Sequence, residues 1–288
     1  MPNRVKALVK LTSTGTLASL AAVLAWLPPV VAARAPLTMF VAVMDQSGQP
    51  VTGLTAADFK VALGSDDCPV VSAARSTEPI ALVIAPASFR RDVLPMRNAV
   101  AAVEDILSHE PGGYEVGVAW QTVRGVTFRR PGETGGLMHD FNQGMSDSPA
   151  LDDGVISAAK ALATRTTMRR VVLALAQHQE SGGYPDDVRK ELQKVKAVLW
   201  GVEVEPVGAS GTSDSDKVLT LISPWSGGRT EQILDINLIE AATRRQMNLL
   251  TNEYTVSFEP PDKVSPNGNL RIAVRRAGVT ILSPPWAS

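Results

Sequence analysis

The run Ile80-Ala81-Leu82-Val83-Ile84 is a short, unbroken apolar segment. Such a run is typical of a strand that is buried on both faces of a parallel sheet. Two similar runs follow, Val171-Val172-Leu173-Ala174-Leu175 and Val198-Leu199-Trp200-Gly201-Val202. Between them lie stretches with apolar residues at steps of three and four, which indicate helices. The alternation predicts an α/β fold: a doubly wound, mostly parallel sheet with right-handed crossovers and helices on both faces.

The segments between these runs complete the predicted core. A helix is expected from Val93, and Pro111-Gly112-Gly113 is its stop signal. The other expected elements are strands at 116–120 and 126–128, a glycine-rich loop through Gly144, and helices at 151–164, 187–197, 217–222 and 238–250.

The two flanks of this core read as short strands. Apolar residues at 37–43 run into the turn signal Asp45-Gln46-Ser47-Gly48 and the chain restarts at Val51, which predicts a hairpin. A second strand pair is expected at 61–63 and 69–72. Neither flank has enough strands to be stable alone. We therefore expect an amino-terminal β segment (36–78) and a carboxyl-terminal one (253–288) to pair into a small β-module, with the core at 79–252.

Composition excludes several classes of protein. The chain has 288 residues, of which 44% are hydrophobic and 20% charged, and a net charge of −1. This balance excludes wholesale disorder and a multi-span membrane protein, and it argues against a nucleic-acid partner. A single cysteine excludes an internal disulfide framework and multi-cysteine zinc sites. That residue, Cys68, is expected either to be buried or to be a free thiol that pairs between molecules.

The first 33 residues are typical of a secretory signal. Arg4, Lys6 and Lys10 precede an apolar stretch from Leu11 to Ala33 that ends in small residues. We expect cleavage after Ala33 and a secreted or periplasmic protein. The alternative is an uncleaved membrane anchor, because this stretch is just long enough to span a bilayer.

Three groups of motifs resemble a known family. They are Val51-Thr52-Gly53-Leu54 with Asp58-Phe59, then Gly227-Gly228-Arg229, and an ending that runs through 254–260, 267–274 and Gly278-Val279. Their order and spacing resemble the VWFA-related proteins, a secreted bacterial branch of von Willebrand factor type A domains. The resemblance implies a doubly wound type A core with flanking β segments.

The resemblance also implies where a metal-ion-dependent adhesion site would lie. In that family an Asp-x-Ser-x-Ser motif, a threonine and an aspartate hold a divalent cation through oxygen ligands. The corresponding positions here are Ala85, Ala87, Phe89, Pro149 and Gln177. We therefore expect no metal and no cofactor.

Ser88, Asp153 and His178 are expected to gather at the carboxyl edge of the sheet, where open α/β sheets bind ligands. One hypothesis is a hydrolase with Ser88 as nucleophile, His178 as base and Asp153 as its orienting group. The simpler interpretation is that Ser88 or Asp92 caps the first helix, that Asp152 or Asp153 caps the helix at 151–164, and that His178 is a solvated loop residue. With Arg90, these residues form the predicted binding face of a non-catalytic module for an unknown protein partner.

Overall fold

The computed structural model describes residues 35–87, 93–120, 125–133, 136–144, 150–165, 169–177, 184–205, 217–261 and 269–287. Contacts divide the chain into two compact units, Met1–Ala35 and Pro36–Ser288, and all that follows concerns the second. The predicted signal segment lies outside the described residues. Within the described part, no helix is long and apolar enough to cross a membrane.

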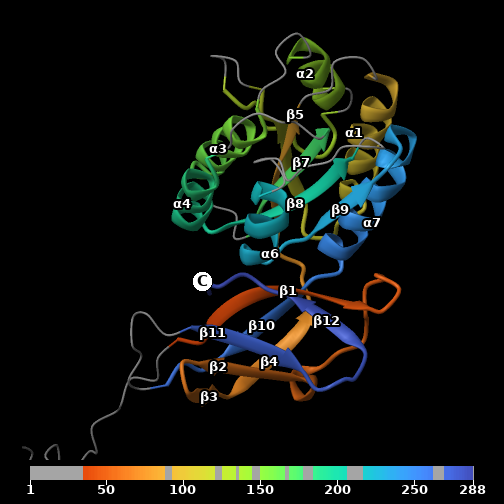
Figure 1. Cartoon of the computed structure of the whole chain (residues 1–288). Helices are drawn as coiled ribbons and strands as arrows, with labels where there is room; N and C mark the ends of the chain where they lie inside the picture. Colours follow the sequence, from red (N-terminus) through yellow and green to blue (C-terminus); the bar gives the residue numbers. More distant parts are fainter. Residues whose placement is uncertain are drawn as a thin grey trace, which may run out of the picture. The chain divides into compact units, whose positions relative to one another are not determined.

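A five-stranded parallel sheet forms the centre of the α/β domain (Figure 1), in the order β6-β5-β7-β8-β9. Its strands are β5 (Ile80–Ala87), β6 (Tyr114–Val118), β7 (Arg169–Gln177), β8 (Ala197–Val204) and β9 (Thr230–Ile233). All eight residues of β5 and all eight of β8 are buried, because helices cover both faces. The three apolar runs therefore became the three central strands.

Helices pack on both faces of this sheet. One apolar core lies beneath α1 (Val93–Leu107), α2 (Gly136–Gly144) and α7 (Ile239–Thr251), with the short η4 (Ile236–Leu238) beside them. The other lies beneath α3 (Leu151–Leu162), α4 (Pro185–Val195), η3 (Val218–Ile222) and α6 (Ser223–Trp225). The prediction of a doubly wound α/β fold is confirmed.

Strands from both flanks form a small β-module, as the sequence predicted. One sheet has the order β12-β1-β10-β4 and the other β11-β2-β3, and a third apolar core lies between them. The strands are β1 (Leu37–Asp45), β2 (Phe59–Leu63), β3 (Asp66–Cys68), β4 (Val70–Arg75), β10 (Tyr254–Phe258), β11 (Leu270–Val274) and β12 (Val279–Leu282), with the short helix η2 (Ala56–Asp58). Cys68 is a free, buried thiol in this core.

The strand pairings inside the module differ from the expected ones. No strand begins at Val51: residues 46–55 make a turn with one bridge between Met44 and Pro50, and β1 pairs with β10 and β12 instead. β2 pairs with β3 across a two-residue turn, because Gly64 adopts a positive φ of 66°. β4 then pairs with β10 in the other sheet.

Three expectations about the core were also wrong or incomplete. The predicted strand at 126–128 is reduced to one bridge between Val116 and Arg129. The expected glycine-rich loop contains α2, whose Leu137 and Phe141 are buried, so apolar spacing outweighed glycine content. β9 was not predicted, because a short, partly exposed edge strand has no continuous apolar run.

Candidate functional site

Four residues form a row across the carboxyl edge of the central sheet. Ala87 of β5 pairs with Ala176 of β7. Glu203 of β8 pairs with Ala176 on one side and with Gln232 of β9 on the other. Because ligands of open α/β sheets bind beyond this edge, the row lies next to the expected binding position.

Few oxygen donors are present among the described residues at the positions where the resemblance would put a metal-ion-dependent adhesion site. Ala85 and Ala87 are 0% and 2% exposed, and both methyl groups belong to the apolar core under α3. Gln177 ends β7 and is half-buried, with a neutral amide in place of a carboxylate. Among the described residues, no group of three or more histidine, cysteine, aspartate or glutamate side chains could hold a metal ion. Phe89 and Pro149 lie outside that part of the chain.

Glu203 is the carboxylate of the row. Its side chain is fully buried, and its Oε2 atom accepts a hydrogen bond of 3.3 Å from Nε2 of Gln232. Sequence reasoning missed this residue because it lies inside an otherwise apolar strand. An acidic residue in such a strand is the signal that could have identified it.

Of the four predicted site residues, the structure describes one. Asp153 lies in the first turn of α3 and is exposed. Ser88, Arg90 and His178 lie outside the described residues, so the catalytic arrangement of Ser88, His178 and Asp153 stays a hypothesis.

The predicted capping role of Asp152 and Asp153 is wrong. The N-cap of α3 is Ala150, which makes no side-chain cap hydrogen bond. Asp152 and Asp153 lie two and three residues after the N-cap, inside the first turn. Asp152 is buried, and its carboxylate accepts a 2.8 Å hydrogen bond from the backbone N–H of Tyr184. Asp152 therefore joins the start of α3 to the segment before α4.

Four exposed large apolar side chains lie in segments that follow the carboxyl ends of central strands. Leu94 lies at the start of α1, Tyr184 just before α4, and Leu234 and Leu238 directly after β9. Each lies in the segment that follows the carboxyl end of a central strand, and α1 contacts η4. We call these four residues the edge patch.

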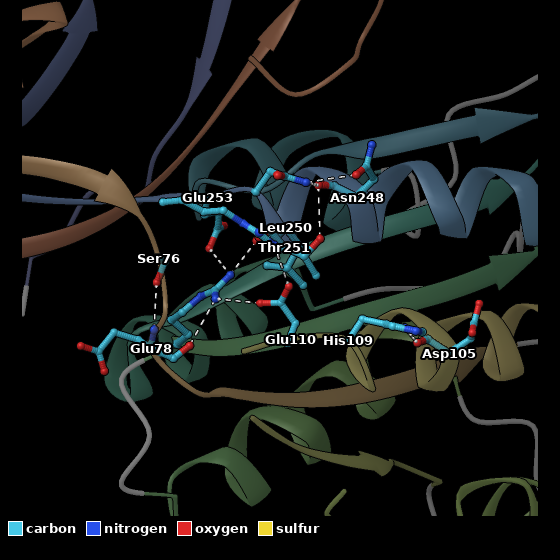
Figure 2. Close-up of polar contacts among 12 residues, drawn as sticks. Ser76, Glu78, Asp105, His109, Glu110, Asn248, Leu250, Thr251 and Glu253 are labelled. Carbon is cyan, nitrogen blue, oxygen red and sulfur yellow. Dashed lines mark hydrogen bonds and ion pairs between the residues drawn. The ribbon is translucent and has the colours of Figure 1, made fainter. Parts of the chain in front are cut away.

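The opposite, amino end of the sheet carries a buried charged cluster of Arg75, Glu110, Arg169 and Glu253. Figure 2 shows Glu253, Glu110 and the backbone of Leu250 around one guanidinium, that of Arg169, which is 1% exposed. Its Nη2 atom donates to the Leu250 carbonyl at 2.6 Å and to Glu253 Oε2 at 3.2 Å. Its Nη1 atom lies 3.8 Å from Glu110 Oε2. A single buried cation therefore neutralises parts of two buried carboxylates.

Arg75 closes the cluster from the β-module. Its Nη2 atom donates to Glu110 Oε1 at 3.1 Å, and its Nε atom donates to the Thr251 carbonyl at 3.1 Å. The Arg75 side chain is half exposed, while that of Glu110 is 4% exposed. The cluster thus connects the end of β4 with the segment after α1 and with the end of α7.

Burial changes the acidity of both carboxylates. It raises the pKa of Glu253 to about 7; Arg169 opposes this rise, and the negative charge of Glu110 adds to it. Burial also raises the pKa of Glu110, against the opposing charges of Arg169 and Arg75. This cluster was not predicted from the sequence, because its members are far apart in the chain. The available signal was the Arg169-Arg170 pair at the start of an apolar strand.

Several solved structures are similar to this chain at low sequence identity. The chain is similar to a von Willebrand factor type A protein from Catenulispora acidiphila, with 11% identity, 87% of this chain and 72% of that chain covered, and a TM-score of 0.45. It is also similar to an aerotolerance-related membrane protein from Bacteroides fragilis, with 12% identity, 60% of this chain and 99% of that chain covered, and a TM-score of 0.40. A third similar structure is the hypothetical protein BatB from Bacteroides thetaiotaomicron, with 11% identity, 60% of this chain and 98% of that chain covered, and a TM-score of 0.39. No family model and no curated protein matches the sequence.

The doubly wound domain with its β-module is the architecture that the resemblance to VWFA-related proteins implies. At 11–12% identity, the structural neighbours lend this chain neither an activity nor a partner.

Proposed function

We propose that this chain is an exported, non-catalytic protein-binding or scaffold module that binds its partner without a divalent cation. The observation that carries the proposal is that Ala85 and Ala87, at positions that the family resemblance assigns to oxygen ligands of a cation, have buried methyl groups. The domain boundaries at 36–78, 79–252 and 253–288 belong to the same proposal.

The export part rests on the sequence. A basic start followed by the apolar stretch Leu11–Ala33 supports removal of residues 1–33 and a place in the cell envelope or outside the cell. Amino-terminal sequencing of the exported protein should find Arg34 first. An intact Met1 would favour the membrane anchor instead.

The edge patch supports a protein partner. Leu234 and Tyr184 are 66% and 65% exposed, and aromatic side chains are enriched at protein interfaces. A partner that covers these side chains would remove apolar area from water, which stabilises a complex without any metal.

A capture experiment with the mature protein and an envelope extract tests this function. Bound proteins are compared between buffers with chelator and with Mg²⁺, and between the native protein and Leu234→Asp. We expect the same bound proteins in both buffers, and at least tenfold less of them with Leu234→Asp, because a charge then lies in the apolar contact.

Leu221→Asp is the matched control. Leu221 is a leucine of similar exposure, 60%, but it lies in η3. Two residues later Ser223 donates to the Leu199 carbonyl near the start of β8, so η3 leads away from the carboxyl edge. Capture that needs Mg²⁺, or that Leu221→Asp reduces as much as Leu234→Asp, would contradict the proposal.

A further inference from the structure

The charged cluster lies where the chain passes between the β-module and the α/β domain. The first passage is the linker from β4 to β5, at residues 76–79, and the second is the turn from α7 to β10, at residues 252–253. The backbone N–H of Ser76 in the first linker donates to the carbonyl oxygen of Glu253 in the second at 2.8 Å. The two linkers are therefore held to each other at the cluster.

Arg169 binds both linkers to the central sheet. Its guanidinium donates to the carbonyl of Glu78 in the first linker at 3.3 Å and to the Glu253 carboxylate in the second. It also lies 5.9 Å from the ring centre of Phe40 in β1. The bonds from Arg169 to the carbonyls of Glu78 and Leu250 do not depend on the charge of Glu253, so they remain when Glu253 is protonated.

The surroundings of Glu253 contain little other compensation for its charge. The charged groups that act on Glu253 are Arg169 of β7 and Glu110 after α1, and Arg170 and Lys196 line the cavity beside it. Arg170 and Lys196 already donate to the carbonyls of Val195 and Ala287. Ionised Glu253 thus depends on Arg169, which it shares with Glu110, whereas protonated Glu253 leaves Arg169 to Glu110 and removes the repulsion between the carboxylates.

A proton can reach this place. A cavity of about 20 Å³, lined by Arg169 and Glu253 together with Phe40 and Trp286, lies beside the cluster. This volume is enough for one water molecule. Proton exchange at Glu253 therefore does not require the whole domain to unfold.

We propose that Glu253, with Arg169, Glu110 and Arg75, forms a proton-operated latch that holds the β-module to the α/β domain. The latch is closed when Glu253 carries a proton and loosens when Glu253 ionises. In the loosened state the two linkers separate and Glu253 meets solvent. This inference concerns regulation of the fold and does not depend on the binding function proposed above.

Hydrogen exchange at the Ser76 amide, measured from pH 4.5 to 8 and corrected for the intrinsic exchange rate, tests the latch in the native protein. The burial that raises the pKa of Glu253 from 4.5 to about 7 means that the closed state holds one more proton than the open state across this range. The opening constant should then rise on the order of a hundredfold between pH 4.5 and 7 and level off above, because one bound proton changes it tenfold for each pH unit.

Two variants and a control make the test specific. Glu253→Gln should keep the latch closed and give a flat profile, whereas Glu259→Gln, a change at an exposed carboxylate of the same segment, should keep the native profile. Glu110→Gln removes the like charge, so the midpoint of the native profile should move to lower pH.

An opening constant that does not change with pH in the native protein would overturn the proposal. An opening constant that rises with pH in folded Glu253→Gln as steeply as in the native protein would also overturn it. If Glu253→Gln does not fold, Glu110→Gln decides: an unchanged or raised midpoint overturns the proposal, and a lowered one supports it.

Discussion

The two ends of strand β7 differ in charge. At its amino end Arg169 is buried among two carboxylates and backbone carbonyls, whereas at its carboxyl end Ala176 and Gln177 carry no charge. The carboxyl edge is where type A proteins would be expected to hold a cation, and the amino end is where the β-module joins. In this chain, therefore, a buried charge network lies at the junction, and the carboxyl edge, which we propose as the binding face, carries exposed apolar side chains.

The largest expected effect is at the amino end. Arg169→Met leaves the carboxylates of Glu110 and Glu253 without their shared cation and should lower the free energy of unfolding by about 3–5 kcal/mol. Denaturant unfolding at pH 7 measures this loss. The control Arg130→Met removes a guanidinium that is 70% exposed, and it should cost at most about 1 kcal/mol. Equal losses in the two variants would remove the distinction between buried and surface charges.

The next effect is the pH dependence of stability. The pKa of Glu253 is raised from 4.5 to about 7 in the folded protein. The stabilisation of the folded state by the proton on Glu253 is therefore fully present below pH 4.5, and it is lost as pH rises to about 7. The loss should be on the order of 3 kcal/mol. Hydrogen bonds from Ser47 and Thr55 lower the pKa of Asp45 and Asp58, so these groups act at more acid pH. Stability that rises between pH 5 and 7 would contradict this assignment.

A smaller effect is expected where the carboxyl-terminal tail docks. Gly227 has a φ of 92°, and a Cβ atom there would lie 2.2 Å from the backbone nitrogen of Pro284. Gly227→Ala should therefore cost about 1–3 kcal/mol and displace Trp286 from Trp225, whose ring centres are 5.6 Å apart. Thermal unfolding with tryptophan fluorescence measures both. An unchanged melting temperature would show that the tail does not stabilise this end.

The smallest effect is at the carboxyl edge. Asp153→Asn removes a negative charge from the first turn of α3 and should lower the free energy of unfolding by at most about 1 kcal/mol. Denaturant unfolding checks this value. A loss of about 2 kcal/mol or more would mean that Asp153 has a structural role, and Asp153 would then no longer be assigned to the binding face.

The central strands and most helices could be predicted because their apolar spacing is local. β5, β7 and β8 are continuous apolar runs, and a fold that buries both faces of a sheet requires such runs. The pairings within the β-module could not be predicted, because β1 finds its partners more than 200 residues away. Short strands with similar patterns can exchange partners without changing which face is apolar.

The candidate site was predicted only in its location. The positions of Ala85, Ala87 and Gln177 at the carboxyl edge follow from strand order. The charge network does not, because Arg75, Glu110, Arg169 and Glu253 meet only after two linkers and the ends of two helices come together. A long-range charge network leaves no periodic signal in the sequence.

Thermal unfolding with and without divalent cations tests the central claim, a carboxyl edge that works without a metal. A cation present at a hundredfold excess over its Kd would stabilise the fold by about 2.7 kcal/mol and raise the melting temperature by roughly 5–10 °C. With Ala85, Ala87 and Gln177 at the edge, we predict no shift when millimolar Mg²⁺ or Mn²⁺ is added to chelator-treated protein. The combined variant Ala85→Asp, Ala87→Ser and Gln177→Asp shows whether oxygen ligands restore a response. A clear stabilisation of the native protein by Mg²⁺ would contradict the account and favour a cation-bridged adhesion site.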